Sequence, residues 1–299
     1  MSPGAGRTAL LVSHTGRADI VELARDAATR LLAAGMAVRV LADEAADLAV
    51  DAAEVVPADG HAADGAEIVF VLGGDGTFLR AAELARPGGA ALVGVNLGRV
   101  GFLAETEPEA LAETVAHILD HGYQVEERMT LDVRVEVEGQ EVATAWALNE
   151  ASVEKVSRER MLEVVIEVDG EPLTSFGCDG VLCSTPTGST AYAFSAGGPV
   201  IWPDVEALLL VPNSAHALFS RPLVTSPASE LTVCVAASGH DAVLFCDGRR
   251  TVPVPSGAKV RVRKADQPVR IVRVHRTPFS DRLVAKFHLP VKGFRERQD

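Results

Sequence analysis

The chain has 299 residues, of which 47% are hydrophobic, so it is long and apolar enough to bury the cores of about two domains. Its formal net charge of −13 argues against general nucleic-acid binding, which favours basic surfaces, but phosphates can still be held by backbone N–H groups and a few local cations. The sequence has neither an apolar run that could span a membrane nor the apolar core of a signal peptide, so we expect a cytoplasmic enzyme.

Up to about residue 125, short apolar runs alternate with alanine-rich helical stretches. The predicted strands are residues 8–12, 37–41, 67–72 and 90–95, and the predicted helices are 19–34, 78–85 and 108–121. Strands that alternate with helices indicate a parallel sheet that is covered on both faces. We therefore expect an α/β domain over residues 1–124.

After residue 125 the pattern changes to two-residue alternation, which is typical of half-buried strands. Strands are predicted at residues 131–137, 141–150, 162–168, 231–236, 242–246, 259–264 and 269–274. Asp169-Gly170 is a hairpin-turn signal after one of them. We expect a mostly-β, sandwich-like domain over residues 125–278. Residues 279–297 are rich in long side chains and are interpreted as a helical tail.

The loop Gly73-Gly74-Asp75-Gly76-Thr77 directly follows a predicted strand and precedes a helix, which places it at a ligand-binding sheet edge. Its glycines let the backbone approach a phosphate, and the helix N-terminus offers free N–H groups. A carboxylate repels phosphate, so Asp75 indicates a different role, which is to accept a proton from a hydroxyl nucleophile, to bind a metal, or both. The alternative is a tight turn with an aspartate helix cap.

Two further loops follow predicted strands. Residues 96–103 (NLGRVGFL) contain two glycines spaced as in a loop at a sheet edge, and a structural turn is the alternative. Asn149-Glu150 places an amide beside a carboxylate, which suits the paired hydroxyls of a sugar. The alternative for this pair is a solvated strand end.

Residues 177–199 contain the most distinctive pattern. Gly177-Cys178-Asp179-Gly180 is followed by STPTGSTAY at 184–192 and SAGGP at 195–199. The glycines, hydroxyl residues and prolines indicate a rigid loop that can wrap a ligand with N–H and hydroxyl groups, and Tyr192 offers an aromatic face for a base. A purely structural loop is the alternative.

The remaining candidates are weaker. His14 and His216 are each either ligand-binding or structural. Asp247-Gly248 is interpreted first as a hairpin turn and only second as part of a site. The basic strands at 261–264 and 270–276 are interpreted as a solvated face. The four cysteines form no CxxC pair, so we expect buried thiols and no metal site built from them.

Taken together, and in this order, the motifs resemble those of the NAD kinase family: GGDGT at 73–77, the run at 96–103, Asn-Glu at 149–150 and TPTGSTAY…SAGGP at 185–199. GGDGT alone is shared with diacylglycerol-type lipid kinases and, loosely, with phosphofructokinases, so the TPTGSTAY block narrows the choice. The chain departs from the family pattern at Arg249, where the family often has glutamine, and at Ala215, where it often has proline.

The resemblance implies a Rossmann-like first domain, a β-rich domain and a tail, 279–299, that returns to the first domain. It implies a homodimer or homotetramer, a divalent cation such as Mg²⁺, and NAD and ATP as substrates. Asp75 would be the proton acceptor, and Gly73, Gly74 and Thr77 would belong to the donor-phosphate loop; no side chain is assigned as a metal ligand. The residues implied for NAD binding are Gly76, Arg80, Phe102, Asn149, Glu150, Arg160, Asp179, Thr190, Ala191, Tyr192, Ser195 and His216.

The predicted reaction moves the terminal phosphoryl group of ATP onto the adenosine 2′-hydroxyl of NAD, while Asp75 takes the hydroxyl proton. Polyphosphate stays open as a donor. Two alternatives also stay open. A lipid or sugar kinase that shares GGDGT would need a different acceptor pocket, and a non-catalytic dinucleotide-binding regulator would not need Asp75.

Overall fold

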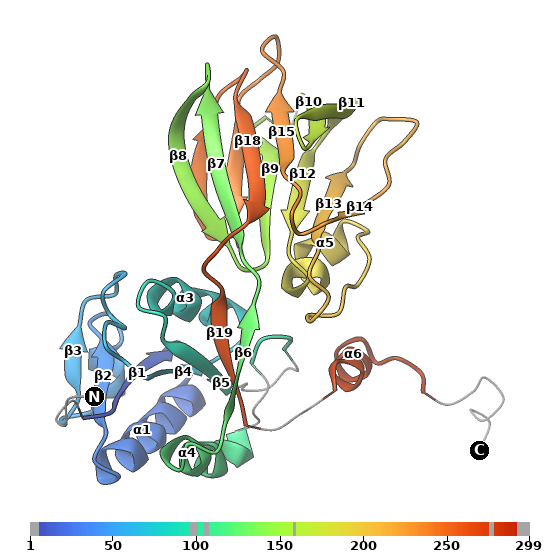
Figure 1. Cartoon of the computed structure of the whole chain (residues 1–299). Helices are drawn as coiled ribbons and strands as arrows, with labels where there is room; N and C mark the ends of the chain where they lie inside the picture. Colours follow the sequence, from blue (N-terminus) through green and yellow to red (C-terminus); the bar gives the residue numbers. More distant parts are fainter. Residues whose placement is uncertain (1–5, 96–100, 105–107, 158–159, 275–277, 292–299) are drawn as a thin grey trace. The chain divides into compact units, whose positions relative to one another are not determined.

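The computed structural model describes residues 6–95, 101–104, 108–157, 160–274 and 278–291 of the chain (Figure 1). The chain forms two compact units. The N-terminal unit comprises Met1–Glu127 together with Val269–Asp299, and the central unit comprises Arg128–Pro268. No helix among the described residues is both long and apolar enough to cross a membrane.

In the described part of the N-terminal unit, a seven-stranded sheet has the order β3-β2-β1-β4-β5-β19-β6. Its strands are β1 (Thr8–Ser13), β2 (Ala37–Leu41), β3 (Glu54–Val56), β4 (Ile68–Leu72), β5 (Ala91–Val95), β6 (Gln124–Arg128) and β19 (Val269–Arg273). The strands from β3 to β19 pair in parallel. The strand order reverses between β1 and β4, and ligands bind at such a switch point in open α/β sheets.

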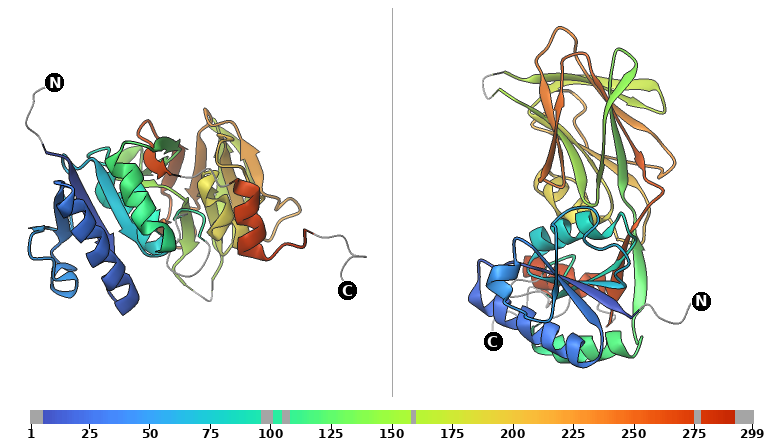
Figure 2. Two further views of the ribbon diagram at one scale, coloured as in Figure 1. Left: turned by 90° about the horizontal axis from the view of Figure 1, so that it is seen from below. Right: turned by 90° about the vertical axis from the view of Figure 1, so that its left-hand side faces the viewer.

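Helices cover both faces of this sheet, as alternating strands and helices require. The helices in the described part of this unit are α1 (Ala18–Ala33), α2 (Ala45–Leu48), α3 (Asp75–Ala85), η1 (Pro108–Ala110), α4 (Leu111–Leu119) and α6 (Phe279–Phe287). Helices α1 and α4 lie on one face and α3 on the other (Figure 1; Figure 2, right). Helix α1 buries Ile20, Ala24 and Leu31 along one stripe, because residues three or four apart share a helix face.

The central unit contains two six-stranded antiparallel sheets in its described residues, of order β11-β10-β15-β18-β7-β8 and β14-β13-β12-β9-β16-β17. The strands are β7 (Leu131–Val137), β8 (Gln140–Ala147), β9 (Glu150–Lys155), β10 (Leu162–Val168), β11 (Glu171–Cys178), β12 (Gly180–Ser184), β13 (Leu208–Asn213), β14 (Leu223–Thr225), β15 (Leu231–Val235), β16 (Ala242–Cys246), β17 (Arg250–Val254) and β18 (Lys259–Lys264). One apolar cluster with members from both sheets forms the core of this sandwich.

A short segment that follows β12 covers the outer side of the second sheet. Its helices η2 (Thr187–Thr190) and α5 (Tyr192–Ser195) pack Ala193 with Leu182, Leu209 and Val211 in a separate apolar cluster. Strands β12 and β13 are therefore buried on both faces. This burial explains why their residues do not show the two-residue alternation of a half-buried strand.

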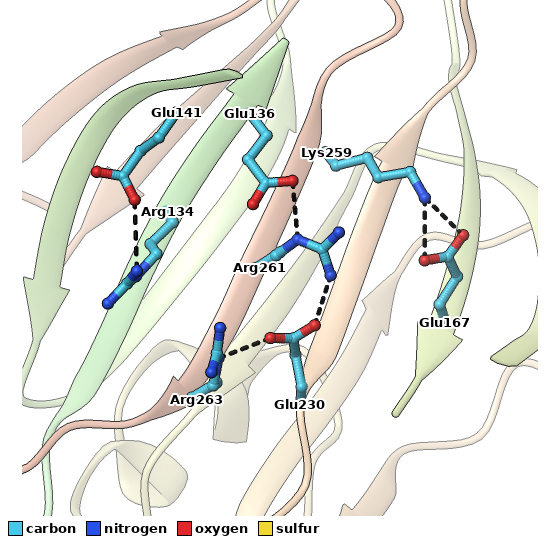
Figure 3. A network of polar contacts seen from close by, with 8 residues as sticks. All are labelled: Arg134, Glu136, Glu141, Glu167, Glu230, Lys259, Arg261 and Arg263. Carbon is cyan, nitrogen blue, oxygen red and sulfur yellow. Dashed lines mark hydrogen bonds and ion pairs between the residues drawn. The ribbon is translucent and has the colours of Figure 1, made fainter. Parts of the chain in front are cut away.

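Three basic residues of β18 are paired with carboxylates on β7, on β10 and just before β15 (Figure 3). The Arg261 guanidinium lies 2.9 Å from a Glu136 oxygen and 2.6 Å from a Glu230 oxygen. Arg263 pairs with Glu230 at 2.6 Å, and Lys259 pairs with Glu167 at 3.0 Å. These cations are neutralised by neighbouring acids, which supports their interpretation as a surface face rather than a nucleic-acid patch.

The predicted architecture, a parallel α/β domain, a sandwich and a returning tail, is confirmed, but the predicted boundary of 125–278 is wrong at its C-terminal end. Strand β19 (Val269–Arg273) pairs with β5 in the first sheet, although the sequence pattern placed it in the sandwich. The predicted strand 141–150 is in fact two strands, because β8 ends at Ala147 and β9 begins at Glu150. A buried apolar strand has the same sequence pattern in either sheet, so alternation alone could not assign β19.

Candidate active site

Asp75 is the first residue of α3, directly after the buried strand β4. The Gly73 N–H donates to the carbonyl of Val95 on the neighbouring strand at 3.2 Å. A side chain at Gly73 would bring its Cβ to 2.8 Å from the Cβ of Thr77 and closer still to its hydroxyl oxygen. The loop therefore needs glycine there so that the first turn of α3 can fold back over it. Its helix N-terminus carries free N–H groups, as predicted.

The Asp75 carboxylate is held by main-chain N–H groups of a second loop. Its Oδ1 accepts from the Leu103 N–H at 3.2 Å, and its Oδ2 lies 3.4 Å from the Phe102 N. Gly101 permits this approach, because a Cβ there would lie 2.5 Å from Oδ1. Gly74 occupies the N-cap position of α3 and Asp75 is the first helical residue, so Asp75 is not the helix cap of the alternative interpretation. The carboxylate is fixed yet only half-buried, as a group that must meet a ligand requires.

The Phe102 ring is buried against the C-terminal helix. Its centroid lies 5.9 Å from those of Phe279 and Phe287, and Arg282 donates to the Phe102 carbonyl at 3.1 Å. Helix α6 thus supports the loop that holds Asp75, a role that its sequence did not reveal. Residues 96–100 of the same predicted loop lie outside the described residues, so their predicted role stays a prediction.

Arg80, predicted beside the coenzyme, lies on α3 and is held by two acids that follow β2. Its guanidinium pairs with Asp43 at 2.5 Å and with Glu44 at 2.6 Å. The other Glu44 oxygen accepts the Ser13 N–H at 2.8 Å. Burial raises the pKa of Glu44 to about 7, against the opposing effects of the Ser13 N–H and Arg80. Glu44, which the sequence pattern did not single out, ties together β1, β2 and α3 at the switch-point edge of the sheet.

In the central unit, Asp247 organises the turn between β8 and β9 that carries Asn149 and Glu150. Its carboxylate accepts the Leu148 N–H at 3.0 Å and the Asn149 N–H at 2.7 Å, and Arg250 pairs with it at 2.6 Å. Asn149 and Glu150 are both buried, so the alternative of a solvated strand end is wrong. The sequence pattern placed Asp247-Gly248 in a hairpin turn first and a site second, and the left-handed backbone of Asp247, with φ of 55°, agrees with the turn.

The hydroxyl groups of the 184–192 block bond mainly within the protein. Thr185 Oγ1 donates to the Leu148 carbonyl at 2.6 Å and accepts the Gly188 N–H at 3.1 Å. Ser189 Oγ donates to the Pro186 carbonyl at 2.7 Å and accepts the Ile201 N–H. A side chain at Gly188 would overlap the Asn149 carbonyl. These buried groups therefore build the turn beside Asn149, and the prediction that they wrap a ligand directly does not hold for Thr185 and Ser189.

A pocket of about 170 Å³ lies beside this turn. Its lining residues are Glu150, Ser152, Glu154, Tyr192, Phe245 and Gly248. The structure thus brings together Glu150 and Tyr192, two of the residues predicted to bind the coenzyme. Thr190, Ala191 and Ser195 lie on the same short segment as Tyr192, and the Asn213 amide donates to the Tyr192 hydroxyl at 3.2 Å.

The other predicted coenzyme residues of the central unit are outside this pocket's lining. Asp179 forms an ion pair with Lys155, which lowers its pKa. The His216 N–H donates to the Gly177 carbonyl at 2.8 Å, next to the Asp179 turn. Arg160 is exposed and lies 2.9 Å from Nε2 of His240. Lys155 belongs to no motif, so the sequence pattern did not single it out.

Three of the four cysteines are buried, as expected, and Cys234 is partly exposed. Burial raises the pKa of Cys178, Cys183 and Cys246 to about 12 and that of Cys234 to about 11, so none is a ready thiolate nucleophile. Within the described ranges, no three His, Cys, Asp or Glu side chains are grouped so that they could hold a metal ion.

Two family models match the chain: the ATP-NAD kinase N-terminal domain over residues 10–123 and the ATP-NAD kinase C-terminal domain over residues 148–274. The chain belongs to the ATP-NAD kinase family. Relatives in this family include an NAD kinase from Nocardia farcinica, 54% identical over 100% of this chain and 96% of its own. The NAD kinase 2 of Streptomyces avermitilis is 58% identical over 99% of both chains.

Solved structures of the family share the fold. Yeast NADH kinase complexed with NADH superposes with a TM-score of 0.86 at 20% identity and covers 97% of this chain and 90% of its own. An NAD kinase from Archaeoglobus fulgidus in complex with ATP gives a TM-score of 0.67 at 24% identity, with coverage of 90% and 94%. The likeness at 20% and 24% identity shows that these two structures share the fold of this chain.

Proposed function

We propose that this ATP-NAD kinase family member transfers the terminal phosphoryl group of ATP to the adenosine 2′-hydroxyl of NAD, with Asp75 as the proton acceptor. Relatives named NAD kinase, 54–58% identical over nearly the whole chain, support the reaction. The observation that carries the role of Asp75 is its carboxylate, fixed by the N–H groups of Phe102 and Leu103 at a glycine-lined helix N-terminus.

The chemistry asked of the protein is mainly positioning and charge stabilisation. The 2′-oxygen forms a bond to the terminal phosphorus, the bond from that phosphorus to its bridging oxygen breaks, and the hydroxyl proton goes to Asp75. General-base help of this kind contributes about 10²–10⁴-fold. The free N–H groups at the start of α3 and the backbone of Gly73, Gly74 and Thr77 would stabilise the donor's phosphate oxygens.

A divalent cation, Mg²⁺, belongs to this proposal. Mg²⁺ is commonly held by one or two carboxylates, the substrate's phosphates and waters rather than by an all-protein cage. The described residues fit that mode, because Asp75 offers a carboxylate beside the donor loop and no group of three ligands competes for the ion. When bound, the cation would neutralise charge on the donor's phosphates.

The coenzyme would be held by Glu150 and Tyr192, which line the pocket, and by Asn149 in the adjoining turn. Gly76, Arg80, Phe102, Arg160, Asp179, Thr190, Ala191, Ser195 and His216 complete the set that we propose for NAD binding. A homodimer or homotetramer is also proposed, and light scattering on the purified protein measures it.

The test incubates the protein with ATP, Mg²⁺ and NAD and detects NADP with an NADP-specific dehydrogenase. Asp75→Asn is expected to lower kcat by at least about 10²-fold with an unchanged circular dichroism spectrum, because the amide cannot take the proton. Asp51→Asn, an exposed site in the same unit, serves as the matched control and should keep its activity.

Two results would contradict the proposal at different points. Wild-type turnover in Asp75→Asn would remove Asp75 from the proton-acceptor role. Folded wild-type protein that forms no NADP, but phosphorylates a diacylglycerol or a sugar in parallel assays, would replace the proposed substrate.

A further inference from the structure

Two buried carboxyl groups lie beside each other under the coenzyme pocket. Glu150 and Asp247 are 6% and 5% exposed. Glu150 is the first residue of β9, and Asp247 directly follows β16. The two strands pair through Ala151 and Cys246, and the Asp247 main-chain N–H donates to the Glu150 carbonyl at 2.9 Å. Like charges this close disfavour double ionisation, so the pair is expected to keep one proton around neutral pH.

The two groups have unequal hydrogen-bond partners. Asp247 accepts from the Leu148 and Asn149 N–H groups and pairs with Arg250, all at 3.0 Å or less. Oε2 of Glu150 is buried and has no partner among the residues that the structure describes. Burial raises the pKa of Asp247 as well, but the Leu148 and Asn149 N–H groups and Arg250 oppose that shift. A buried anion needs donors, so the negative charge belongs on Asp247 and the proton on Glu150.

The surrounding charges act in the same direction. Burial raises the pKa of Glu150 to about 8, with further contributions from the charges of Asp247 and Glu154, while the Tyr192 N–H opposes the shift. The other titratable groups nearby are the Tyr192 phenol and the Cys246 thiol, both with raised pKa values, so they stay neutral. Arg250, the nearby cation, is engaged by Asp247 and stacks over Trp146 at 4.3 Å.

We propose that Glu150 serves the coenzyme pocket as a neutral carboxylic acid that donates a hydrogen bond to an acceptor atom of the bound nucleotide, and that Asp247 keeps it in this state. The inference rests on the proposed function for its ligand. A neutral donor selects a ring nitrogen or an oxygen acceptor on the coenzyme, whereas a carboxylate would select a hydroxyl or amino donor. Glu150 is thereby a specificity-determining residue, and Asp247 is a positioning residue that acts through it.

The pocket suits one ring of a nucleotide rather than a whole coenzyme. Its volume of about 170 Å³ is below the range of roughly 300–1,000 Å³ that drug-sized ligands occupy. Tyr192, Phe245 and Glu150 are among its lining residues. Aromatic residues together with a hydrogen-bond donor suit a flat heterocycle that carries an acceptor atom.

Calorimetric titration of the full chain with NAD alone, from pH 6.5 to 9.5, tests the proposal. If NAD binds the neutral form of Glu150, the apparent Kd stays constant below pH 7 and rises above pH 8. With the midpoint at about 8, it is about 30-fold larger at pH 9.5 than at pH 6.5, because binding is weakened by the fraction of competent protein. A Kd that is flat or falls with rising pH, in protein that stays folded by circular dichroism, overturns the proposal.

Glu150→Gln keeps a donor and cannot ionise, so its Kd for NAD should lose the rise between pH 7 and 9.5. Asp247→Asn removes the neighbouring charge and should move the midpoint to lower pH. Glu163→Gln replaces an exposed glutamate on β10 and should keep the wild-type pH profile. A wild-type profile in Glu150→Gln overturns the proposal, and if that variant does not fold, the wild-type titration decides. Absence of NAD binding at every pH would instead contradict the proposed function.

Discussion

Replacing Gly101 by alanine tests the placement of the Asp75 carboxylate without altering any group that takes part in the reaction. The new Cβ would lie 2.5 Å from Asp75 Oδ1 and 3.3 Å from its Cγ, whereas ordinary contact begins at 3.4 Å. The first distance is about 0.9 Å too short (3.4 − 2.5), so the carboxylate must move by about 1 Å. A misplacement of about 1 Å at a reacting group can cost about 10²-fold in rate.

We therefore expect Gly101→Ala to lower kcat for NADP formation by about 10²-fold, measured at saturating ATP and NAD and well below the melting temperature. Gly60→Ala is the matched control, because its Cβ would meet only Pro87 at 3.8 Å, and it should turn over at the wild-type rate. If Gly101→Ala is folded and fully active, then either the carboxylate does not need this position or the loop at 101–103 yields without cost, and the steric reasoning fails.

Two further predictions concern stability. Thr185→Val removes the bonds to the Leu148 carbonyl and the Gly188 N–H, so urea denaturation should show a loss of about 1–3 kcal/mol, and the exposed Thr251→Val should show none. For Glu44, a folded-state pKa of about 7 against 4.5 means that the folded state binds more protons than the unfolded state between these values. Its contribution to the free energy of unfolding is thus lost as pH rises from about 4.5 to about 7. Glu44→Gln should lack this loss, so the free energy of unfolding of the wild type relative to that of the variant should fall over this pH range. A difference between the two free energies that stays constant from pH 4.5 to about 7, measured by urea denaturation, would refute the assignment.

The central strands and main helices of the N-terminal unit could be predicted from the sequence because they carry strong local signals, whereas the edge strands β3 and β6 were not predicted. Helix α1 buries one stripe and ends before Gly35, whose φ is +81°. Strand β4 is fully buried and leads through two glycines into α3. An apolar run followed by glycines and then a helix is recognisable within about twenty residues, so the position of Asp75 at a strand's carboxyl end followed from local pattern alone.

The sandwich was predicted less completely, for reasons that lie in long-range packing. Strands β12 and β13 are buried on both faces, so they show no alternation. The residues of β12 were interpreted as part of the loop at 177–199 because the glycines and prolines beside them dominated that pattern, and β13 was not predicted. Strand β19 alternates normally, and only its pairing with β5 assigns it to the first sheet.

The candidate site shows the same division between local and long-range information. The sequence identified Asp75, Glu150 and Tyr192 because each lies in a short motif. It did not identify Glu44, and it placed Asp247 first in a hairpin turn and only second in a site, because their partners are distant: Arg80 lies 36 residues from Glu44, and Asn149 lies 98 residues from Asp247. A lone acid beside a turn carries no local mark of what it binds after folding.

Main-chain N–H groups control both Asp75 and Glu150, the two carboxyl groups to which we assign a function. Residues with little or no side chain allow these N–H groups to come close. Asp75 is fixed through Gly101, which leaves space for its Oδ1. In the pocket, Gly188 lets its segment close on the Asn149 carbonyl, and Asp247 takes the N–H groups that Glu150 then lacks. The donors at Asp75 fix where its carboxylate lies, while donors withheld from the buried Oε2 of Glu150 favour the neutral acid. The placement of main-chain donors therefore sets the position of one carboxyl group and the proposed protonation state of the other.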